Sequence, residues 1–406
     1  MKTYDWIVVG GGFTGAALAY ELVKKGFSVL LLEQDANFQN ATRYSYGGLA
    51  FWSGTTSVTR QLCDEGIARY RILSQELNAN IELRELDLLL TIPIDTDPKT
   101  AATSYAHFAN PPKLLGVDAA CDMEPLLNRE AIAGALTVKH GHINPQKTVQ
   151  AYIQAFLRAG GEIEISQVLK LQNNPAPPTA LLPASGEGLG EGLSVETTTT
   201  IYHSANVVVC AGGFSRNLLK ASGILIPLYF THAEVIETPP IEMKLRTLVM
   251  PANLQRFQLE AESSKIDEVW NEPGNEPVAP ILDAGAVQFI DGSLRLGQIS
   301  RIITDPTAKV DSGESERWLR QSIGKILPEL ANLPGTWHHC LVAFSGNHLP
   351  LIGAIPGCQG IYVFSGFSNP LVIVPPLAQR FANWVSGQED EIISQLYSSI
   401  LGGGVA

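Results

Sequence analysis

The chain has 406 residues, of which 45% are hydrophobic and 17% are charged, a composition typical of globular proteins and unlike that of disordered ones. This length exceeds what one hydrophobic core usually serves, so we expect two domains. A net charge of −12 argues against nucleic acid as a partner, because binding to phosphate backbones needs clustered Lys and Arg.

No apolar run in the sequence reaches the length of a membrane span. A strand is expected within the first ten residues, which leaves no room for a secretory signal. The sequence therefore predicts a cytoplasmic protein with no membrane span.

The first predicted element combines a strand, a glycine turn and a helix. Residues 5–9 form an apolar strand, and Gly10, Gly12 and Gly15 follow it in GxGxxG spacing. Gly10 allows a tight turn, Gly12 lets the backbone approach a pyrophosphate, and Gly15 lets the helix pack closely on its strand. The phosphates would lie at a helix N-terminus, where amide donors and the helix dipole favour negative charge.

The elements that follow the glycine turn strengthen this interpretation. A helix is expected over 16–25, ended by Gly26, and a second strand over 27–32 leads to Glu33. Glu33 follows Gly12 by 21 residues, near the roughly 20 expected for the acid that binds a ribose hydroxyl. The pattern as a whole predicts a dinucleotide site, and a glycine turn that binds nothing is the weaker alternative.

The middle of the chain alternates between strand and helix signals. In chain order we expect a polar, glycine-bearing loop over 40–48, a helix over 58–77, a strand over 85–94, a short helix over 113–127, a helix over 146–159 and a strand over 162–165. Residues 172–194 are rich in Pro, Gly and Glu, which predicts a mobile loop between two strands.

A second strand that runs into glycines is expected over 205–213, facing the same cofactor as the first. Two apolar runs, 286–290 and 293–297, are separated by Asp291 and Gly292, which is a hairpin signal. The remaining expected elements are a helix over 318–327, a strand over 360–364, a closing helix over 374–386 with Pro375 and Pro376 in its first turn, and a flexible tail over 401–406.

The cysteines and histidines do not form a metal-binding pattern. The five cysteines lack any C-x-x-C pair, and neither His140 with His142 nor His338 with His339 has further ligands at a suitable spacing. We therefore expect no metal.

Taken together, these segments resemble the flavoprotein family that contains D-amino-acid oxidase, glycine oxidase and sarcosine oxidase. The resemblance extends over nearly the whole chain and is carried by Gly10 to Glu33, by the segment from Glu124-Pro125-Leu126-Leu127 to Asn144-Pro145, by residues 207–212, and by residues 349–353 with 364–368. It implies an α/β fold in which a discontinuous, Rossmann-like domain binds FAD and a second α+β domain is built on a mostly antiparallel sheet. The implied FAD-binding domain comprises 1–80, 140–224 and 338–400, and the substrate or cap domain comprises 81–139 and 225–337.

The resemblance also implies positions for the cofactor. The first three glycines would hold the pyrophosphate, Glu33 the adenosine ribose, Val168 the adenine, and Gly366 would stand beside the isoalloxazine. The full set of implied cofactor-binding residues is Gly10, Gly12, Phe13, Thr14, Gly15, Glu33, Gln34, Arg43, Ser45, Gly47, Gly48, Val168, Ala211, Gly212, Gly366, Ser368, Asn369, Pro370 and Leu371. For these residues, turn formation or core packing is the alternative role.

One departure from the family lies at the flavin end. Members usually have a glycine-rich turn that presents backbone amides to the flavin, whereas this chain has Asn369, Pro370 and Leu371. Proline has no amide hydrogen, and leucine does not readily adopt a positive φ. Contact with the flavin must be rebuilt or lost here.

A second departure concerns the substrate. Amino-acid oxidases of this family carry an arginine that binds the substrate carboxylate, and the corresponding position here is Val342, with Asn347 at the acid position. Arg295 lies where sarcosine oxidase has a lysine facing the flavin, and we assign it as the candidate catalytic residue. Arg256 and Arg301 are further candidates, with a solvated surface position as the alternative for each.

The resemblance implies an FAD-dependent oxidoreductase that transfers a hydride from a small amine, amino acid or related substrate to flavin N5, with reoxidation by oxygen or another acceptor. Cys340 lies one residue from the position of the flavin-linked cysteine of sarcosine oxidase, so we predict non-covalent FAD. Two alternatives stay open, a flavin-binding protein with an altered or lost catalytic site and an NAD-dependent dehydrogenase. The sequence does not indicate the substrate, the electron acceptor or the oligomeric state.

Overall fold

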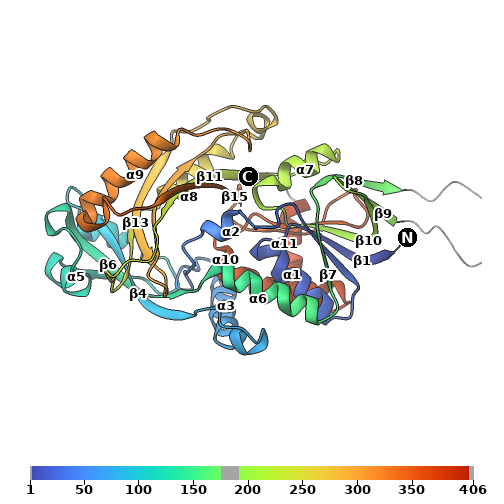
Figure 1. Cartoon of the computed structure of the whole chain (residues 1–406), viewed down its shortest axis with the longest axis horizontal. Helices are drawn as coiled ribbons and strands as arrows, with labels where there is room; N and C mark the ends of the chain where they lie inside the picture. Colours follow the sequence, from blue (N-terminus) through green and yellow to red (C-terminus); the bar gives the residue numbers. More distant parts are fainter. Residues whose placement is uncertain (1, 175–191, 402–406) are drawn as a thin grey trace, which may run out of the picture.

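Two β-sheets organise the chain, whose computed structural model describes residues 2–174 and 192–401 (Figure 1). The predicted loop over 172–194 lies for the most part outside the described residues, as does the predicted tail except Leu401, which ends a helix. The two sheets lie side by side in Figure 1, the N-terminal sheet on the right and the second sheet on the left.

The first sheet has the strand order β16-β17-β10-β1-β2-β7, and its five neighbouring strands from β17 to β7 are parallel. A hairpin of β8 and β9 extends it from β10. The strands are β1 (Thr3–Val9), β2 (Val29–Glu33), β7 (Glu162–Ile165), β8 (Val168–Asn174), β9 (Gly192–Thr197), β10 (Ile201–Val209), β16 (Leu351–Ala354) and β17 (Ile361–Ser365).

The central strands of the first sheet are apolar on both sides, as buried parallel strands are, and both faces of the sheet are covered. Five helices cover one face. Trp6 and Val8 of β1 point into a core that includes Phe156 and Phe381 from these helices. The covering helices are α1 (Phe13–Lys24), α3 (Ser57–Glu76), α6 (Pro145–Arg158), α10 (Pro370–Val385) and α11 (Glu391–Leu401), while α7 (Ser215–Ala221) packs on the other face.

The second sheet has the order β15-β11-β14-β13-β12-β4-β6-β3, with β5 also paired to β6. All of its pairs are antiparallel except β12 with β4. Its strands are β3 (Gly48–Leu49), β4 (Arg84–Pro93), β5 (Lys113–Leu115), β6 (Ile132–His142), β11 (Leu228–Glu237), β12 (Leu248–Pro251), β13 (Ile281–Gln288), β14 (Leu294–Arg301) and β15 (Thr336–Ser345).

One face of the second sheet carries the amphipathic helix α9 (Ser312–Ile326), which buries Leu319 and Ile323 against it (Figure 1). The other face contributes to a cavity. The remaining short helices are α2 (Ala41–Tyr44), α4 (Pro98–Ser104), α5 (Val117–Met123) and α8 (Gln255–Ser263), with 3₁₀ turns η1 (Arg129–Ala131), η2 (Gly212–Phe214), η3 (Asp267–Asn271) and η4 (Pro328–Leu330).

The predicted α/β fold class is confirmed, and so is the hairpin at Asp291-Gly292, where Gly292 has a φ of +92° and joins β13 to β14. Within the described part of the chain, no helix is both long and apolar enough to cross a bilayer. The predicted domain boundaries stay a prediction; β15 and β6 of the second sheet each extend across one of them, at 338 and at 139.

Three local predictions were wrong. Residues 113–127 form β5 and α5 rather than one helix, because Lys113 to Leu115 pair with β6 and Gly116 is extended. The loop over 40–48 contains α2 and the start of β3. The closing helix begins at Pro370, four residues earlier than predicted, so Pro375 and Pro376 lie inside it rather than in its first turn.

Candidate active site

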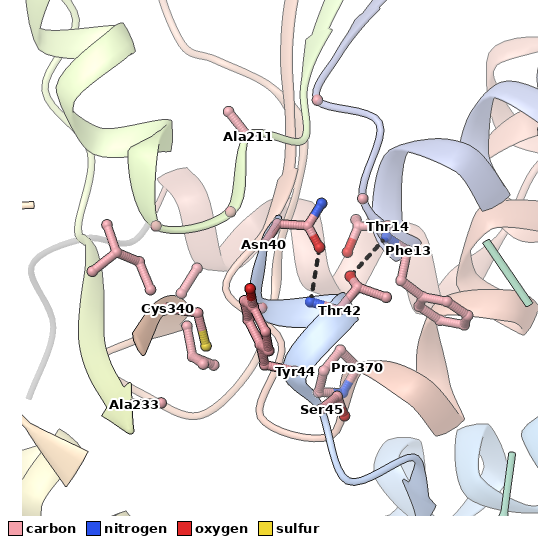
Figure 2. A pocket seen from close by; sticks show the side chains of 18 of the residues that line it. Phe13, Thr14, Asn40, Thr42, Tyr44, Ser45, Ala211, Ala233, Cys340 and Pro370 are labelled. Atoms are coloured by element: carbon pink, nitrogen blue, oxygen red, sulfur yellow. Dashed lines mark hydrogen bonds between the residues drawn. The ribbon is translucent and has the colours of Figure 1, made fainter. Parts of the chain in front are cut away.

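A cavity of about 790 Å³ lies where the carboxyl ends of β1, β2 and β10 meet the inner face of the second sheet (Figure 2). Its volume falls within the roughly 300–1,000 Å³ of small-molecule sites. The carboxyl edge of a parallel sheet is also the usual place for ligands in α/β folds. We therefore take this cavity as the candidate active site.

The glycine turn after β1 forms one end of the cavity. Gly10 has a φ of +105°, and a Cβ on Gly15 would lie 1.8 Å from the Gly10 carbonyl oxygen, so the helix contacts the turn without any room for a side chain. Gly12 is the N-cap of α1 and offers no side-chain cap. The Phe13 amide donates to the Thr42 hydroxyl, and the other amides of the first turn of α1 are left for an anion.

Glu33 lies at the end of β2 beside this turn. Its carboxylate accepts hydrogen bonds from the Gly11 amide at 2.6 Å and from the Asp35 amide at 3.0 Å. Burial raises the pKa of Glu33, while these backbone amides act in the opposite direction. The two amides hold the carboxylate in a fixed position at the cavity wall.

The short helix α2 supplies part of the wall that sequence reasoning missed (Figure 2). The Asn40 side chain caps α2 by accepting from the amides of Thr42 and Arg43. The Thr42 hydroxyl accepts from the Phe13 amide at 3.1 Å, which links α2 to the start of α1. No motif spacing marks Asn40 and Thr42 in the sequence. The preference of Asn for the N-cap position is the one signal that could have indicated Asn40.

The N-terminus of α10 forms the far end of the same wall. Pro370 occupies the first helical position, which needs no amide hydrogen, and the Asn369 side chain donates to the Ala50 carbonyl oxygen at 3.2 Å. Asn369 makes no side-chain cap, so α10 presents an open, partly positive N-terminus to the cavity. A helix N-terminus thus stands where the sequence lacks a glycine-rich turn.

Most of the sequence-predicted cofactor residues line the cavity, and three do not. Gly15 packs against the turn, and Arg43 points to a polar cluster. Gly47 has a φ of +73°, and a Cβ there would lie 2.2 Å from the Ile143 carbonyl oxygen. The residues that do line it are Gly10, Gly12, Phe13, Thr14, Glu33, Gln34, Ser45, Gly48, Val168, Ala211, Gly212, Gly366, Ser368, Asn369, Pro370 and Leu371.

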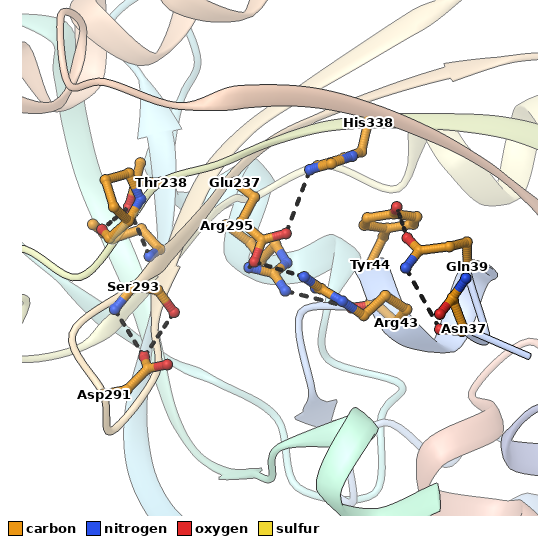
Figure 3. Close-up of polar contacts among 12 residues, drawn as sticks. Asn37, Gln39, Arg43, Tyr44, Glu237, Thr238, Asp291, Ser293, Arg295 and His338 are labelled. Atoms are coloured by element: carbon orange, nitrogen blue, oxygen red, sulfur yellow. Dashed lines mark hydrogen bonds and ion pairs between the residues drawn. The ribbon is translucent and has the colours of Figure 1, made fainter.

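Arg295, the sequence-predicted catalytic residue, is among the residues of a polar cluster rather than of the cavity wall (Figure 3). Glu237 receives ion pairs from Arg43 at 3.0 Å and from Arg295 at 3.1 Å, and His338 lies 3.4 Å from its second oxygen. Tyr44 stacks on His338 with ring centroids 4.4 Å apart. Arg295 is only 5% exposed, and burial lowers its pKa. The cluster ties α2 to the second sheet.

The second sheet gives the cavity an apolar floor of Leu88, Leu248, Met250 and Val287. His140 stands beside this floor and accepts a hydrogen bond at Nδ1 from the Trp52 indole at 3.0 Å. Burial lowers the pKa of His140 to about 4, so the ring is neutral and carries its hydrogen on Nε2.

Arg256 of α8 is the only Lys or Arg among the described residues that line the cavity. Its Nε donates to the Glu260 carboxylate at 2.9 Å. Val342, at the position where the family resemblance places an arginine, lines the cavity with an apolar side chain. Arg301 does not line the cavity and pairs with buried Glu234.

Among residues 2–174 and 192–401, no group of three or more His, Cys, Asp or Glu could hold a metal ion.

Comparisons with known proteins agree with this architecture. A family model described as FAD dependent oxidoreductase (DAO) matches residues 5–384. Glycine oxidase of Geobacillus kaustophilus (strain HTA426) is 26% identical over 389 residues, which cover 92% of this chain and 90% of that protein. The 4-methylaminobutanoate oxidase (formaldehyde-forming) of Paenarthrobacter nicotinovorans is 26% identical over 397 residues, which cover 93% of this chain and 43% of that protein.

The solved structure of glycine oxidase from Geobacillus kaustophilus has the same fold, with a TM-score of 0.76 at 21% identity and 96% of each chain covered. The family match extends over far more than half of the sequence. The chain therefore belongs to the DAO family of FAD-dependent oxidoreductases.

Proposed function

We propose that this FAD-dependent oxidoreductase oxidises a small amine or amino acid at the carbon next to nitrogen. The observation that carries the proposal is the continuity of one cavity from the glycine turn at Gly10 to the apolar floor at Leu248. A dinucleotide bound at the glycine turn would extend toward the apolar floor, where the rest of the cavity is small. Glycine and 4-methylaminobutanoate, named in the two relatives, both carry an amine, which supports an amine donor.

The residues of the cavity fit FAD. The uncapped N-terminus of α1 offers amides for the pyrophosphate, and the fixed carboxylate of Glu33 retains lone pairs for a ribose hydroxyl. Val168 would contact the adenine. Gly366 and the N-terminus of α10 would contact the isoalloxazine. Bound FAD supplies the hydride acceptor; the protein supplies orientation, an apolar floor that excludes water, and the charge of the helix terminus.

We also propose that the FAD is bound non-covalently. Cys340 borders the cavity, and burial raises the pKa of its thiol to about 12, which disfavours the thiolate that covalent attachment would need. Precipitation of the purified protein with acid should leave the flavin in the supernatant. Flavin colour that stays with the precipitate would contradict this proposal.

We propose a cytoplasmic location for the protein. We also propose that the FAD-binding domain comprises 1–80, 140–224 and 338–400, with 81–139 and 225–337 as the substrate domain. Limited proteolysis with mass spectrometry should cut near 81 or 225, which lie between elements, before it cuts within the strands of either sheet.

The decisive experiment is anaerobic reduction of the purified protein. A denatured extract should release FAD rather than a nicotinamide nucleotide, and the family assignment already favours FAD over NAD. Small amines and amino acids are then added without oxygen, and bleaching of the flavin absorbance by one of them would establish the activity. The apolar Val342 favours the alternative of a flavin-binding protein with a lost catalytic site. If no amine, amino acid or hydroxy acid bleaches the flavin, that alternative holds.

A further inference from the structure

His140 of β6 is a buried polar side chain in the apolar floor of the cavity. Leu86 of β4 pairs with His140 and Leu88 pairs with Val138, so His140 and Leu88 lie on the same face of the second sheet. Leu248 of β12 pairs in turn with Leu88. His140 is 8% exposed and lines the cavity together with these two leucines. A polar side chain therefore lies among apolar ones in the floor.

The hydrogen bond from Trp52 determines which ring nitrogen of His140 carries the hydrogen. An indole nitrogen can only donate, so Nδ1 of His140 accepts at 3.0 Å and the ring hydrogen is on Nε2. Burial lowers the pKa of His140 to about 4, so the ring is neutral at neutral pH. Trp52 is buried as well and packs edge-on against Phe108, which holds the indole in place. The Nε2–H group is therefore a donor of fixed position rather than a base.

This donor makes no hydrogen bond to any residue that the structure describes. A Cβ on Gly48 would lie 2.7 Å from the His140 Nε2 atom, so glycine at this position lets the ring approach β3 and leaves the nitrogen uncovered. Gly48 lines the cavity as well. Buried donors are almost always paired in folded proteins, so an unpartnered one at the wall of a cavity points to a ligand.

We propose that His140 donates from Nε2 to an uncharged oxygen of the substrate, such as a hydroxyl, ether or carbonyl oxygen on an otherwise apolar group. This inference rests on the proposed function and adds a second recognised group to the amine. A cationic group has no lone pair to accept from Nε2–H. A carboxylate at this place would lose its hydration for one hydrogen bond from a neutral ring, which costs more than the bond returns. A purely apolar group would leave the donor unpaired.

The test uses the FAD-loaded protein and small probes that carry no amine. Cyclopentanone has one oxygen acceptor, and methylenecyclopentane has nearly the same shape without it. Binding is followed by perturbation of the flavin absorbance and by the shift in melting temperature. We expect cyclopentanone to bind about tenfold more tightly than methylenecyclopentane, because only the ketone pairs with the buried donor.

Two substitutions of His140 separate the roles of its two nitrogens. His140→Asn places an oxygen where Nδ1 accepts from Trp52 but has no donor at the Nε2 position, so the two probes should bind equally. His140→Gln places an amide nitrogen near the Nε2 position, so part of the preference for cyclopentanone should return. Trp52→Phe lets the hydrogen of His140 occupy either nitrogen, and should reduce the preference without abolishing it.

His232→Asn is the matched control. His232 is also buried, burial lowers its pKa to about 4, and its Nε2 donates to the Ile303 carbonyl oxygen at 3.1 Å. It does not line the cavity. The variant should lose stability while the tenfold preference for cyclopentanone is kept.

If His140→Asn does not fold, Gly48→Ala tests the same donor, because the added methyl group would lie 2.7 Å from Nε2 and cover it. Equal binding of the two probes by the parent protein would overturn the proposal, as would an unchanged preference in a folded His140→Asn or Gly48→Ala protein. The proposed function fails separately: cyclopentanone could bind at His140 while no amine or amino acid bleaches the flavin. Conversely, bleaching by an amine in a protein without the preference would overturn the oxygen site alone.

Discussion

The Tyr70 hydroxyl donates a 2.5 Å hydrogen bond to the Leu371 carbonyl oxygen and thereby joins the middle of α3 to the first turn of α10. This carbonyl would normally accept from the amide four residues later, but that residue is Pro375, which has no amide hydrogen. Tyr70 is fully buried, so no water can replace its hydroxyl. Tyr70 thus allows a proline inside a helix whose N-terminus borders the cavity.

Tyr70→Phe should lower the free energy of unfolding by about 1–3 kcal/mol, because it leaves a buried carbonyl without a partner. Urea denaturation measures the change. The matched control is Tyr20→Phe, whose hydroxyl bonds, among the described residues, only to the partly exposed Glu76 at 3.2 Å. A loss as large for Tyr20→Phe as for Tyr70→Phe would contradict the role assigned to the Tyr70 hydroxyl.

Gly15→Ala should abolish flavin retention. The added Cβ would lie 1.8 Å from the Gly10 carbonyl oxygen, so α1 must move away from the turn that we assign to the pyrophosphate. The ratio of flavin to protein after purification measures the effect, and the parent protein gives the reference value. Gly116→Ala is the control, because no atom of the residues that the structure describes lies within 4 Å of its added Cβ. A Gly15→Ala protein with full flavin content would contradict the assignment.

The parts of the site that the sequence predicted are the parts set by local geometry. Gly10 and Gly15 could be placed because a tight turn and a close helix contact each demand glycine, and Glu33 follows at a fixed distance along the chain. Arg256 was only one arginine among several. Its position at the cavity depends on how α8 lies against distant strands, which no local pattern records.

The closing helix illustrates the same limit. Helix signals alone place Pro375 and Pro376 in the first turn, because prolines inside helices are costly. The cost is offset by Tyr70, which lies about 300 residues earlier in the sequence. A contact between residues so far apart cannot be derived from helix signals alone, so the start of the helix was predicted four residues too late.

Glu237→Gln should lower the free energy of unfolding by about 3 kcal/mol, because Arg295 remains buried without its charged partner. The variant should also release the flavin more readily than the parent protein. The loss of flavin follows because Glu237 holds Arg43 of α2, the helix that lines the cavity. Fluorescence titration of the apoprotein with FAD measures the affinity. Asp118→Asn, which breaks an exposed pair with Arg129, should change stability by less than about 1 kcal/mol.

The Glu237→Gln variant also separates two roles for Arg295. If Arg295 acts only through the cluster, Glu237→Gln saturated with FAD should be reduced by substrate at nearly the parent rate. A loss of rate at full flavin occupancy, with Arg295→Lys restoring part of the rate lost in Arg295→Met, would instead support the catalytic assignment made from the sequence.

Stability should fall as the pH is lowered from about 6.5 to about 4. Burial lowers the pKa of His140 and of His232 to about 4, whereas the same groups in the unfolded chain titrate near 6.5. Within this window the unfolded chain binds more protons than the folded one, so the free energy of unfolding rises with pH by up to about 1.4 kcal/mol per pH unit for each such histidine. Chemical denaturation at closely spaced pH values measures this slope.

The contribution of one histidine is isolated by His140→Asn, whose Oδ1 takes the place of Nδ1 and can still accept from the Trp52 indole, but which does not titrate. Glu33 and Asp283, whose pKa values burial raises, act in the opposite direction and reduce the total slope in both proteins equally. The difference between the two slopes therefore reports His140 alone. We expect the slope for the variant to be smaller by up to about 1.4 kcal/mol per pH unit between pH 4 and 6.5. Identical slopes would mean that His140 binds its proton over the same pH range in the folded and the unfolded protein.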